Sequence, residues 1–469
     1  MKLVSIPILS AIIFTSSFVL CKSNEDASAA KTKTQDDSPI KAADATNVLS
    51  NGRDIPLIGM GIGNLPSDRI DEVVSFNLQL GSRLVDTARA SRNESMLSKA
   101  IDKYFEGTAD KMDGSEDNVV HVVTKVWYTH LGYERTKIAV GESLRDLTMN
   151  QNVDTRVHIL LHWPRCDDNI AWMNCEKEER RLPKYVQEAG PPPHLNKDTA
   201  WQDSWKALED LYAEDRNNRE ANMGRRPIIE SIGISNFDWN DMVSLLDICR
   251  IKPLIYQGNV WKVFHDPRMM NLLNENNILF QAYNIMNGVH HRKSSAPNAF
   301  AVLSRIAAHL SKTRQELHDD QRLETKVTEG MVIMAWLVQQ GISVVPRASS
   351  NTHQVENSPS SIISLPRMSS EEIETVKNAM SALMKGEDVK VKAVFHNEFM
   401  RSIQLHWMNQ VTGEEVPVTD QVLPGVTLTI DSHPGHTFVA YCSMKKLRKE
   451  YEVTAEYGNS DHFFIHGEL

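Results

Sequence analysis

Three residues whose side chains can polarise a carbonyl group follow or end three apolar segments of the chain. Asp86 lies in SRLVDTA, Lys125 in VVTKVW and His162 in HILLHW. An ammonium group held by a carboxylate stabilises negative charge on oxygen, and an imidazole donates a hydrogen bond to a developing alkoxide. Taken singly, the three have ordinary roles as a helix cap, a surface charge and a core histidine. Together, at the ends of consecutive strands, they predict a site for a carbonyl compound.

The elements that position these residues are apolar runs alternating with amphipathic stretches. Eight strand-like runs, most of them followed by a helical period, predict an α/β fold in the form of a (β/α)₈ TIM barrel, whose active site lies at the C-terminal strand ends. A doubly wound sheet is the alternative, but the glycine-rich strand-to-helix fingerprint of that fold is absent. The predicted strands are 55–61, 82–88, 121–127, 156–163, 228–237, 254–260, 278–283 and 343–348.

Motifs in a fixed order relate the barrel to a known family. An Asn-Gly pair precedes IPLIGMG, and GSRLVDTA, VVTKVW, HILLHWP, IGISNF, QAYN and VVPRAS follow in that order. Residues 48–385 therefore resemble the aldo-keto reductase family, (β/α)₈ enzymes that reduce aldehydes and ketones with NADPH. Each motif alone is weak, whereas their order makes the resemblance specific. A small aldehyde or ketone is the implied substrate.

The resemblance implies a catalytic aspartate, tyrosine, lysine and histidine. Asp86, Lys125 and His162 match three of the four, and Ser91 stands at the tyrosine position. The Asn-Glu pair at 93–94 keeps the frame of the family, so the serine is a replacement and not a shift of the alignment. The resemblance thus implies a catalytic set in which the general acid has changed.

The loss of the tyrosine has a chemical consequence. A phenol has a reference pKa of about 10, whereas a serine hydroxyl is several units less acidic and makes a poor general acid. We expect reduced or altered activity. The proton would come from His162, from a water molecule at Ser91 or, less favoured, from Tyr128 beyond the next strand. Complete loss of reduction is the remaining alternative.

The positions that bind the cofactor in this family are better kept. Tyr283 would stack on the nicotinamide ring, and Arg347 would hold the 2′-phosphate of NADPH. His353 departs from the family, because an arginine usually stands there, so NADH stays open. The implied cofactor-binding residues are Ser235, Asn236, Gln257, Tyr283, Arg347, His353, Glu356 and Asn357.

The last part of the chain has no helical period. Residues 389–469 contain short alternating runs separated by turn residues, which predict a small all-β sandwich. The runs LHWMN, LPG and SHPGHTF resemble the β domain of the von Hippel-Lindau tumour suppressor family over residues 389–465. In that family a serine, a histidine and aromatic side chains form a pocket for hydroxyproline in an extended peptide. A peptide ligand is therefore implied.

The implied pocket is incomplete in this chain. The tyrosine of the family pocket is missing, and its position falls near Thr419. A serine and histidine that merely close a turn are the alternative interpretation. The residues implied to bind the peptide are Trp407, Ser432, His436 and Phe438.

The N-terminal segment predicts entry into the secretory pathway. Lys2 precedes an apolar run interrupted by serines, which is typical of a signal peptide, and the next segment lacks the apolar residues needed to fold. An uncleaved membrane anchor is the alternative. We expect the protein in the ER lumen or secreted. The predicted organisation is a signal peptide at 1–22, a disordered linker at 23–47, the barrel at 48–388 and the β domain at 389–469.

Charge and cysteine content narrow the classes of partner. The chain of 469 residues has 51 basic and 61 acidic side chains and a formal net charge of −10. Without a long basic run in the sequence, nucleic acid is not an expected partner, and no metal site is predicted.

Cys166 and Cys175 lie close enough in sequence to close a small disulfide loop in an oxidising compartment. Unpaired buried thiols fit the cysteine count equally well.

Two functions from different classes fit these patterns. The first is an NAD(P)H-dependent carbonyl reductase whose Ser91 lowers or alters activity. The second is a protein that binds NADPH without turnover, as a sensor, and binds a peptide with its β domain.

The glycosylation sequon at Asn93 adds a constraint, because a glycan beside the site would oppose catalysis. We expect Asn93 to stay unmodified.

Overall fold

The computed structural model describes most of the chain beyond residue 44. No helix within those residues is long and apolar enough to cross a bilayer. The predicted signal peptide and nearly all of the predicted linker lie outside them. The described residues are 45–107, 118–148, 153–221, 228–264, 266–286, 289, 292–317, 326–386, 391–409, 412–433, 435–442, 447–454 and 460–466.

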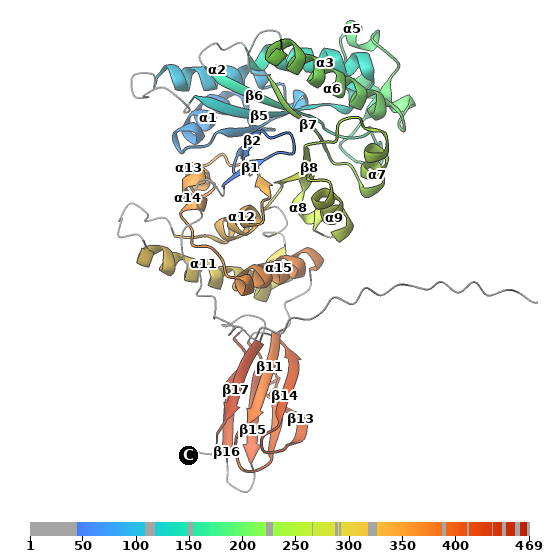
Figure 1. Ribbon diagram of the computed structural model, residues 1–469. Helices are drawn as coiled ribbons and strands as arrows, with labels where there is room; N and C mark the ends of the chain where they lie inside the picture. The colour runs from blue at the N-terminus through green and yellow to red at the C-terminus, as the bar shows by residue number, and fades with distance from the viewer. Residues whose placement is uncertain are drawn as a thin grey trace, which may run out of the picture. The chain divides into compact units, whose positions relative to one another are not determined.

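Eight parallel strands form the barrel, in the sequence order β3 to β10. Figure 1 shows β5 to β8 of this sheet among the helices. A parallel bridge between Ile58, just before β3, and Val344 of β10 closes the sheet. The prediction of a (β/α)₈ barrel is confirmed, although several strands are shorter than the apolar runs suggested. The strands are β3 (Met60–Gly61), β4 (Leu84–Asp86), β5 (Val119–Val126), β6 (Asp154–Leu161), β7 (Ile229–Ser235), β8 (Ile255–Asn259), β9 (Leu279–Tyr283) and β10 (Ser343–Val344).

The central strands are buried on both faces because helices cover the sheet from outside. β7 is buried along its whole length, and β5 is buried from Val120 onward. This accounts for their nearly continuous apolar runs, in place of an alternating pattern. The residues of β5 that point into the barrel include Lys125, and parallel pairing aligns it with Leu160 of β6. The polar strand ends therefore meet at one end of the barrel.

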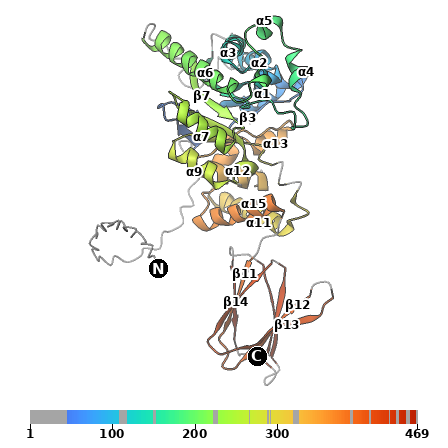
Figure 2. The same ribbon diagram turned by 90° about the vertical axis from the view of Figure 1, so that its right-hand side faces the viewer.

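Helices follow the strands, and α11 and α15 lie side by side in both views (Figures 1 and 2). α11 continues to Leu317. The helices of the barrel region are α1 (Ile70–Gln79), α2 (Glu94–Glu106), α3 (Tyr133–Leu147), α6 (Ala200–Arg216), α7 (Trp239–Ile248), α8 (Val260–Val263), α9 (Pro267–Glu275), α11 (Pro297–Leu317), α12 (Glu329–Gln339), α13 (Asn351–Glu356), α14 (Pro359–Ile363) and α15 (Ser370–Lys385).

A short hairpin precedes the barrel, as the Asn-Gly pair predicts. β1 (Thr46–Val48) pairs antiparallel with β2 (Asp54–Pro56). Gly52 in the connecting turn has a φ of 77°, which a glycine adopts without strain. Ala45 is buried and accepts a hydrogen bond from the backbone N–H of Leu57, so part of the predicted linker belongs to the folded barrel region.

The C-terminal region forms two antiparallel-rich sheets, which Figure 2 shows face to face. Phe395 of one sheet packs against Phe438 of the other, with ring centroids 5.1 Å apart. The all-β sandwich is confirmed, and β13 is the strand that sequence patterns missed, because it is mostly exposed and contains Pro417. The strands are β11 (Val391–Asn397), β12 (Ile403–Met408), β13 (Glu415–Val422), β14 (Thr427–Ser432), β15 (Thr437–Cys442), β16 (Leu447–Glu452) and β17 (Ser460–Ile465).

Candidate active site

A buried ion pair lies at the C-terminal end of the barrel. Lys125 Nζ from β5 donates to Asp86 Oδ1 of β4 at 2.5 Å and to the carbonyl oxygen of Thr87 at 2.6 Å. The side chain of Lys125 is only 4% exposed and that of Asp86 14%. Charges so far from water interact strongly, and the pair places a fixed positive charge inside the barrel mouth. The structure thus brings together two of the three residues that the strand ends singled out.

His162 follows β6 and completes this group. Its backbone N–H donates to the carbonyl oxygen of Val126 at 2.9 Å, which holds it at the end of the neighbouring strand. Its ring meets the Trp127 ring edge-on, with centroids 4.9 Å apart. Burial, together with the positive charge of Lys125, lowers the pKa of His162 well below its usual value. The imidazole is therefore uncharged near neutral pH and is a hydrogen-bond donor, not a proton source.

The pKa of His162 predicts how stability depends on pH. An unfolded chain binds a proton at this histidine below a pH of about 6.5, whereas the folded chain does not, so stability falls as the pH falls. The loss due to His162 is at most about 1.4 kcal/mol per pH unit below that pH. Urea unfolding of the natural protein and of His162→Gln between pH 7 and 5 measures it. A variant with the same pH dependence as the natural protein would contradict this assignment.

Ser91 lies at the end of a short 3-10 helix, η3 (Arg89–Ser91), directly after β4. Its side chain is half-buried, and a methyl group placed at Gly63 would lie 3.7 Å from Ser91 Oγ. Arg92 follows in the left-handed conformation, with a φ of 52°. Ser91 Oγ forms no hydrogen bond to any other described residue. It is thus free to hold a water molecule or a ligand.

The Asn-Glu pair after Ser91 is structural. Asn93 is 3% exposed, accepts from Thr87 Oγ1 at 2.5 Å and donates to the carbonyl oxygen of Ile62 at 3.1 Å. Glu94 is 1% exposed and accepts from Thr124 Oγ1 at 2.6 Å. These bonds fix η3 and the start of α2 against the barrel. A buried amide with both ends engaged is a poor glycosylation acceptor, which supports the expectation for Asn93.

The hydroxyl of Tyr128 is already engaged by a carboxylate. Tyr128 is fully buried, and its hydroxyl donates to Glu178 Oε1 at 2.6 Å. Burial and this bond to a carboxylate raise the pKa of Tyr128 far above its usual value. The phenol that stands nearest in sequence to Lys125 is therefore unsuited to act as a general acid.

The polar residues at the ends of β7 and β9 form a connected group. Asn236 donates from Nδ2 to the carbonyl oxygen of His162 at 3.0 Å and to Ser235 Oγ at 3.1 Å. The hydroxyl of Tyr283 donates to Asn236 Oδ1 at 2.6 Å. Burial, and next the charge of Asp86, raise the pKa of Tyr283 to about 12, so this phenol stays protonated. The bond orients the Tyr283 ring at the mouth of the barrel.

Gln257 has partners that the sequence did not predict. Its amide nitrogen donates to Asp86 Oδ1 at 2.6 Å and to Gln281 Oε1 at 2.7 Å. Gln281 in turn donates to Ser343 Oγ at 3.1 Å. The amide of Gln257 therefore supports the Asp86 carboxylate. Gln281, a fully buried residue of β9, is a supporting residue that sequence reasoning missed, because only its burial beside Gln257 distinguishes it.

The residues expected at the far end of the cofactor come from the segment after β10. Arg347 is exposed and has no acidic partner among the residues that the structure describes. His353 and Glu356 belong to the short helix α13, and Asn357 ends it. His353 is exposed, and the other two are half-buried. The structure therefore leaves the guanidinium of Arg347 available to a phosphate group.

Comparison with known proteins assigns this barrel to a family. The family model described as Aldo/keto reductase family matches residues 58–380, more than half of the chain. The chain belongs to the aldo/keto reductase family. It is an oxidoreductase family, and the match ends before the C-terminal β sandwich.

The relatives are distant but cover most of the barrel. The NAD(P)H-dependent D-xylose reductase of Kluyveromyces lactis is 25% identical over 319 residues, which cover 66% of this chain and 86% of that protein. The NADPH-dependent aldose reductase of Saccharomyces cerevisiae is 25% identical over 320 residues, with the same coverage of 66% and 86%. The solved aldose reductase from Schistosoma japonicum, 22% identical, aligns with 71% of this chain and 91% of its own, with a TM-score of 0.47.

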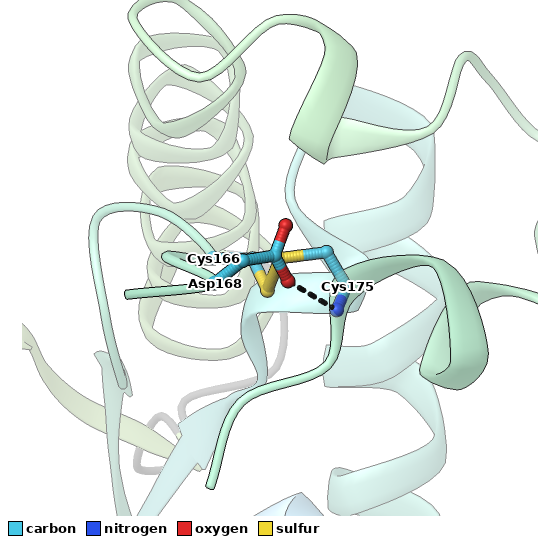
Figure 3. Close-up of side chains that lie close together, drawn as sticks. All are labelled: Cys166, Asp168 and Cys175. Carbon is cyan, nitrogen blue, oxygen red and sulfur yellow. Dashed lines mark hydrogen bonds between the residues drawn. A yellow bond between two sulfur atoms is a disulfide. The ribbon is translucent and has the colours of Figure 1, made fainter. Parts of the chain in front are cut away.

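A disulfide-closed insertion follows β6 of this aldo/keto reductase barrel. The structure joins Cys166 to Cys175, as the sequence allowed, and Asp168 Oδ1 accepts from the backbone N–H of Cys175 at 3.1 Å (Figure 3). Because both thiols are in the disulfide, the nearby Asp168 carboxylate completes no metal site. The insertion continues through α4 (Cys175–Glu179) and α5 (Lys184–Gln187).

A buried ion pair anchors the insertion to the barrel. Both terminal nitrogens of Arg135, from α3, donate to the Glu179 carboxylate at 2.9 Å. Arg135 is 1% exposed and also donates to the carbonyl oxygens of Thr129, Gln187 and Gly190. Sequence reasoning missed this pair, because nothing in either segment indicates its partner. The insertion is thereby a fixed part of the site mouth.

Removing the disulfide should loosen this insertion. The two cysteines are nine residues apart, and cross-linking a loop of this size stabilises a protein by about 2 to 3 kcal/mol. We expect Cys166→Ser with Cys175→Ser to lower the free energy of unfolding by that amount in guanidinium titrations under oxidising conditions. Cys249→Ser, which removes a free thiol, is the control. Equal stability of the double variant and the natural protein would refute the expectation.

The structure brings together only some of the residues that were expected to bind a peptide. Ser432 Oγ and His436 Nδ1 lie 3.0 Å apart, and the ring centroids of Trp407 and His436 are 5.4 Å apart. Trp407 Nε1 is buried without a hydrogen-bond partner among the described residues. The prediction that Phe438 binds the peptide is wrong. Phe438 is 2% exposed and packs in the core against Phe395, because its position on β15 faces the other sheet. It is not available to a ligand.

Proposed function

We propose that this chain is an NADPH-dependent oxidoreductase that reduces a small aldehyde or ketone, with Ser91 in the place of the tyrosine. The observation that carries the proposal is the Lys125–Asp86 pair, 4% and 14% exposed, held at 2.5 Å at the mouth of the barrel. Burying two charges has a large desolvation cost, and a pair with a merely structural role does not have to face the site. The family relationship and the uncharged imidazole of His162 support the same activity.

The residues present fit a dinucleotide cofactor. Arg347 offers an unengaged guanidinium to the 2′-phosphate, which favours NADPH over NADH. Tyr283 offers a ring oriented by its bond to Asn236 Oδ1. Two similar proteins are named as NAD(P)H-dependent and NADPH-dependent reductases, which supports the assignment. The bound cofactor supplies the hydride.

The side chains at the barrel mouth have separate roles in the proposed reaction. The ammonium of Lys125 stabilises the negative charge that develops on the carbonyl oxygen, and Asp86 keeps that ammonium in place. The uncharged ring of His162 donates a hydrogen bond to the same oxygen. A water molecule bound at Ser91 gives the proton that converts the alkoxide into an alcohol. The expected rate is low, because water is a weak acid.

A direct test follows cofactor binding and turnover separately. NADPH is titrated into the full chain by fluorescence, and its oxidation is then followed with benzaldehyde in excess. Binding with slow turnover supports the reductase. Binding without turnover in the natural protein, restored by Ser91→Tyr, would overturn it in favour of a cofactor-binding protein without activity. Absence of both would leave the family relationship as a statement about the fold.

A second function is favoured by the C-terminal domain. We propose that this domain, which resembles the von Hippel-Lindau β domain, binds an extended peptide at Ser432, His436 and Trp407. The buried, unpaired Trp407 Nε1 supports the proposal, because a hydrogen bond to an acceptor on the ligand would remove the free-energy cost of leaving this group unpaired. On this alternative the barrel binds NADPH as a sensor, and the missing tyrosine is the observation in its favour.

The peptide proposal is tested with a matched pair of ligands. Peptides that differ only in hydroxyproline or proline are titrated into the full chain by calorimetry. Weaker binding of the proline peptide, and loss of that difference in Ser432→Ala, support a hydroxyl-reading pocket. Equal binding of the two peptides, or no binding, would overturn it.

We also propose that the protein passes through the secretory pathway. The Cys166–Cys175 disulfide supports this location, because such bonds persist in oxidising compartments. The mass of the mature N-terminus, measured after expression in a secreting host, tests cleavage of the signal peptide at 1–22. An intact N-terminus in the membrane fraction would favour an anchor instead.

A further inference from the structure

A cavity of about 760 Å³ lies beside the candidate active site. Its walls are the loop η3 with the start of α2, the segment after β5, the outer part of α3 and the insertion from Glu178 to Val186. None of the functions assigned above uses it. The insertion, which the disulfide and the Arg135–Glu179 pair hold in place, supplies a large part of the lining.

The carboxylates on the cavity wall already have donors. Arg89 donates to Glu94, Glu142 and Asp146 at distances of 2.6 to 2.8 Å. Glu178 accepts from Trp127 Nε1 at 2.8 Å and from the hydroxyl of Tyr128. These donors within the chain offset part of the negative charge that the carboxylates present to a ligand.

Two guanidinium groups on the wall have no acidic partner. Arg92 and Arg181 line the cavity, both are exposed, and neither is paired with a carboxylate within the described part of the chain. Arg92 has a φ of 52°, a conformation that is unfavourable for a residue with a side chain. Backbone strain of this kind is most common at functional sites. The free hydrogen-bonding capacity of the cavity is therefore cationic and donor-type.

The cavity adjoins the reacting groups. Arg92 follows Ser91 directly, so one turn carries both Ser91 of the candidate active site and Arg92 of the cavity wall. Trp127 lines the cavity, and its ring centroid is 4.9 Å from that of His162. Trp127 thus contacts both the cavity and the imidazole of His162.

We propose that the cavity binds a carboxylate group of the carbonyl substrate, held by the guanidiniums of Arg92 and Arg181. The inference rests on the proposed reductase activity and narrows it to substrates that carry a carboxylate away from the reacting carbonyl. Guanidinium groups bind carboxylates through two parallel hydrogen bonds, which gives geometric selectivity as well as affinity. The insertion then serves as the element that positions Arg181.

The binding test uses a ligand that cannot react. Suberate, a flexible dicarboxylate, and suberamide, its neutral counterpart, are titrated into the full chain by calorimetry. We expect suberate to bind more tightly, and Arg181→Gln or Arg92→Gln to weaken it by about tenfold, as for the loss of one charge-assisted bond. Arg180→Gln is the matched control, because Arg180 is exposed, pairs with Glu176 and does not line the cavity. Equal binding of both ligands, or equal loss in Arg180→Gln, would overturn the proposal.

A kinetic test separates this inference from the reductase proposal. The ratio of kcat/KM for suberic semialdehyde to that for its neutral amide should exceed one, and should fall about tenfold in Arg181→Gln but not in Arg180→Gln. Turnover of both aldehydes with an unchanged ratio would reject the carboxylate site and leave the reductase intact. Suberate binding without turnover of any aldehyde would reject the reductase, and with it the assignment of the bound carboxylate to a substrate.

Discussion

Ser91→Tyr should raise kcat/KM for an aromatic aldehyde by about a hundredfold to ten-thousandfold, because it restores a positioned general acid. The phenol would lie on η3, within the same barrel mouth as the Lys125 ammonium, whose charge favours release of its proton. Gly63, which has no side chain, faces Ser91 and leaves space for a larger residue. Oxidation of NADPH over a range of aldehyde concentrations that extends well below KM measures the change.

The control for this substitution is Ser91→Phe, which fills the same space without a hydroxyl. We expect it to bind NADPH like the tyrosine variant but to turn over no faster than the natural protein. An equal gain in the phenylalanine variant would show that packing, and not acidity, limits the rate. A natural protein as fast as Ser91→Tyr would mean that the water at Ser91, or another group, already supplies the proton efficiently.

Lys125→Met should lower the free energy of unfolding by about 3 kcal/mol, because it leaves the buried Asp86 carboxylate without its counter-ion. The Gln257 amide still donates to Asp86 Oδ1, which keeps the loss at the lower end of the range for broken buried pairs. Turnover should fall with it, since the charge that stabilises the alkoxide is gone. Guanidinium unfolding and NADPH oxidation measure the two effects.

The chain contains a matched surface pair for comparison. Lys103 Nζ lies 2.5 Å from Asp71 Oδ2, the same distance as in the buried pair, but the two side chains are 70% and 51% exposed. Lys103→Met should therefore change stability by less than about 1 kcal/mol. A double variant, Lys125→Met with Asp86→Asn, should recover part of the lost stability. Similar losses for both lysines would refute the role of burial.

The two C-terminal strand ends that bear Asp86 and Lys125 also show how the protein combines chemistry with stability. The ammonium is held by a carboxylate and a backbone carbonyl, and the carboxylate by an amide. A site built this way loses both its charge and its geometry when one member is removed. Ser91 is different, because its hydroxyl has no hydrogen-bond partner among the described residues whose loss would affect folding. We therefore expect the fold to tolerate substitution at that position.

Much of the barrel follows from the sequence alone. The alternation of apolar runs with helical periods predicts the parallel strands, because strands buried on both faces need continuous apolar residues. Strand ends place Asp86, Lys125 and His162 at one rim, and the Asn-Glu frame predicts that Ser91 stands at the tyrosine position of the family. These inferences depend on local periodicity and order along the chain, which the sequence carries directly.

Tertiary structure decided the partners of individual side chains. Hydrogen bonds join Gln257 to Asp86, Tyr128 to Glu178 and Arg135 to Glu179, in each case between segments that are far apart in the chain. Phe438 lies in the core, a direction that spacing along the strand does not define. The cavity beside Ser91 is of the same kind, since four separate segments line it. Side-chain direction depends on which neighbour fills the adjacent space, and that neighbour is fixed only when the whole barrel has packed.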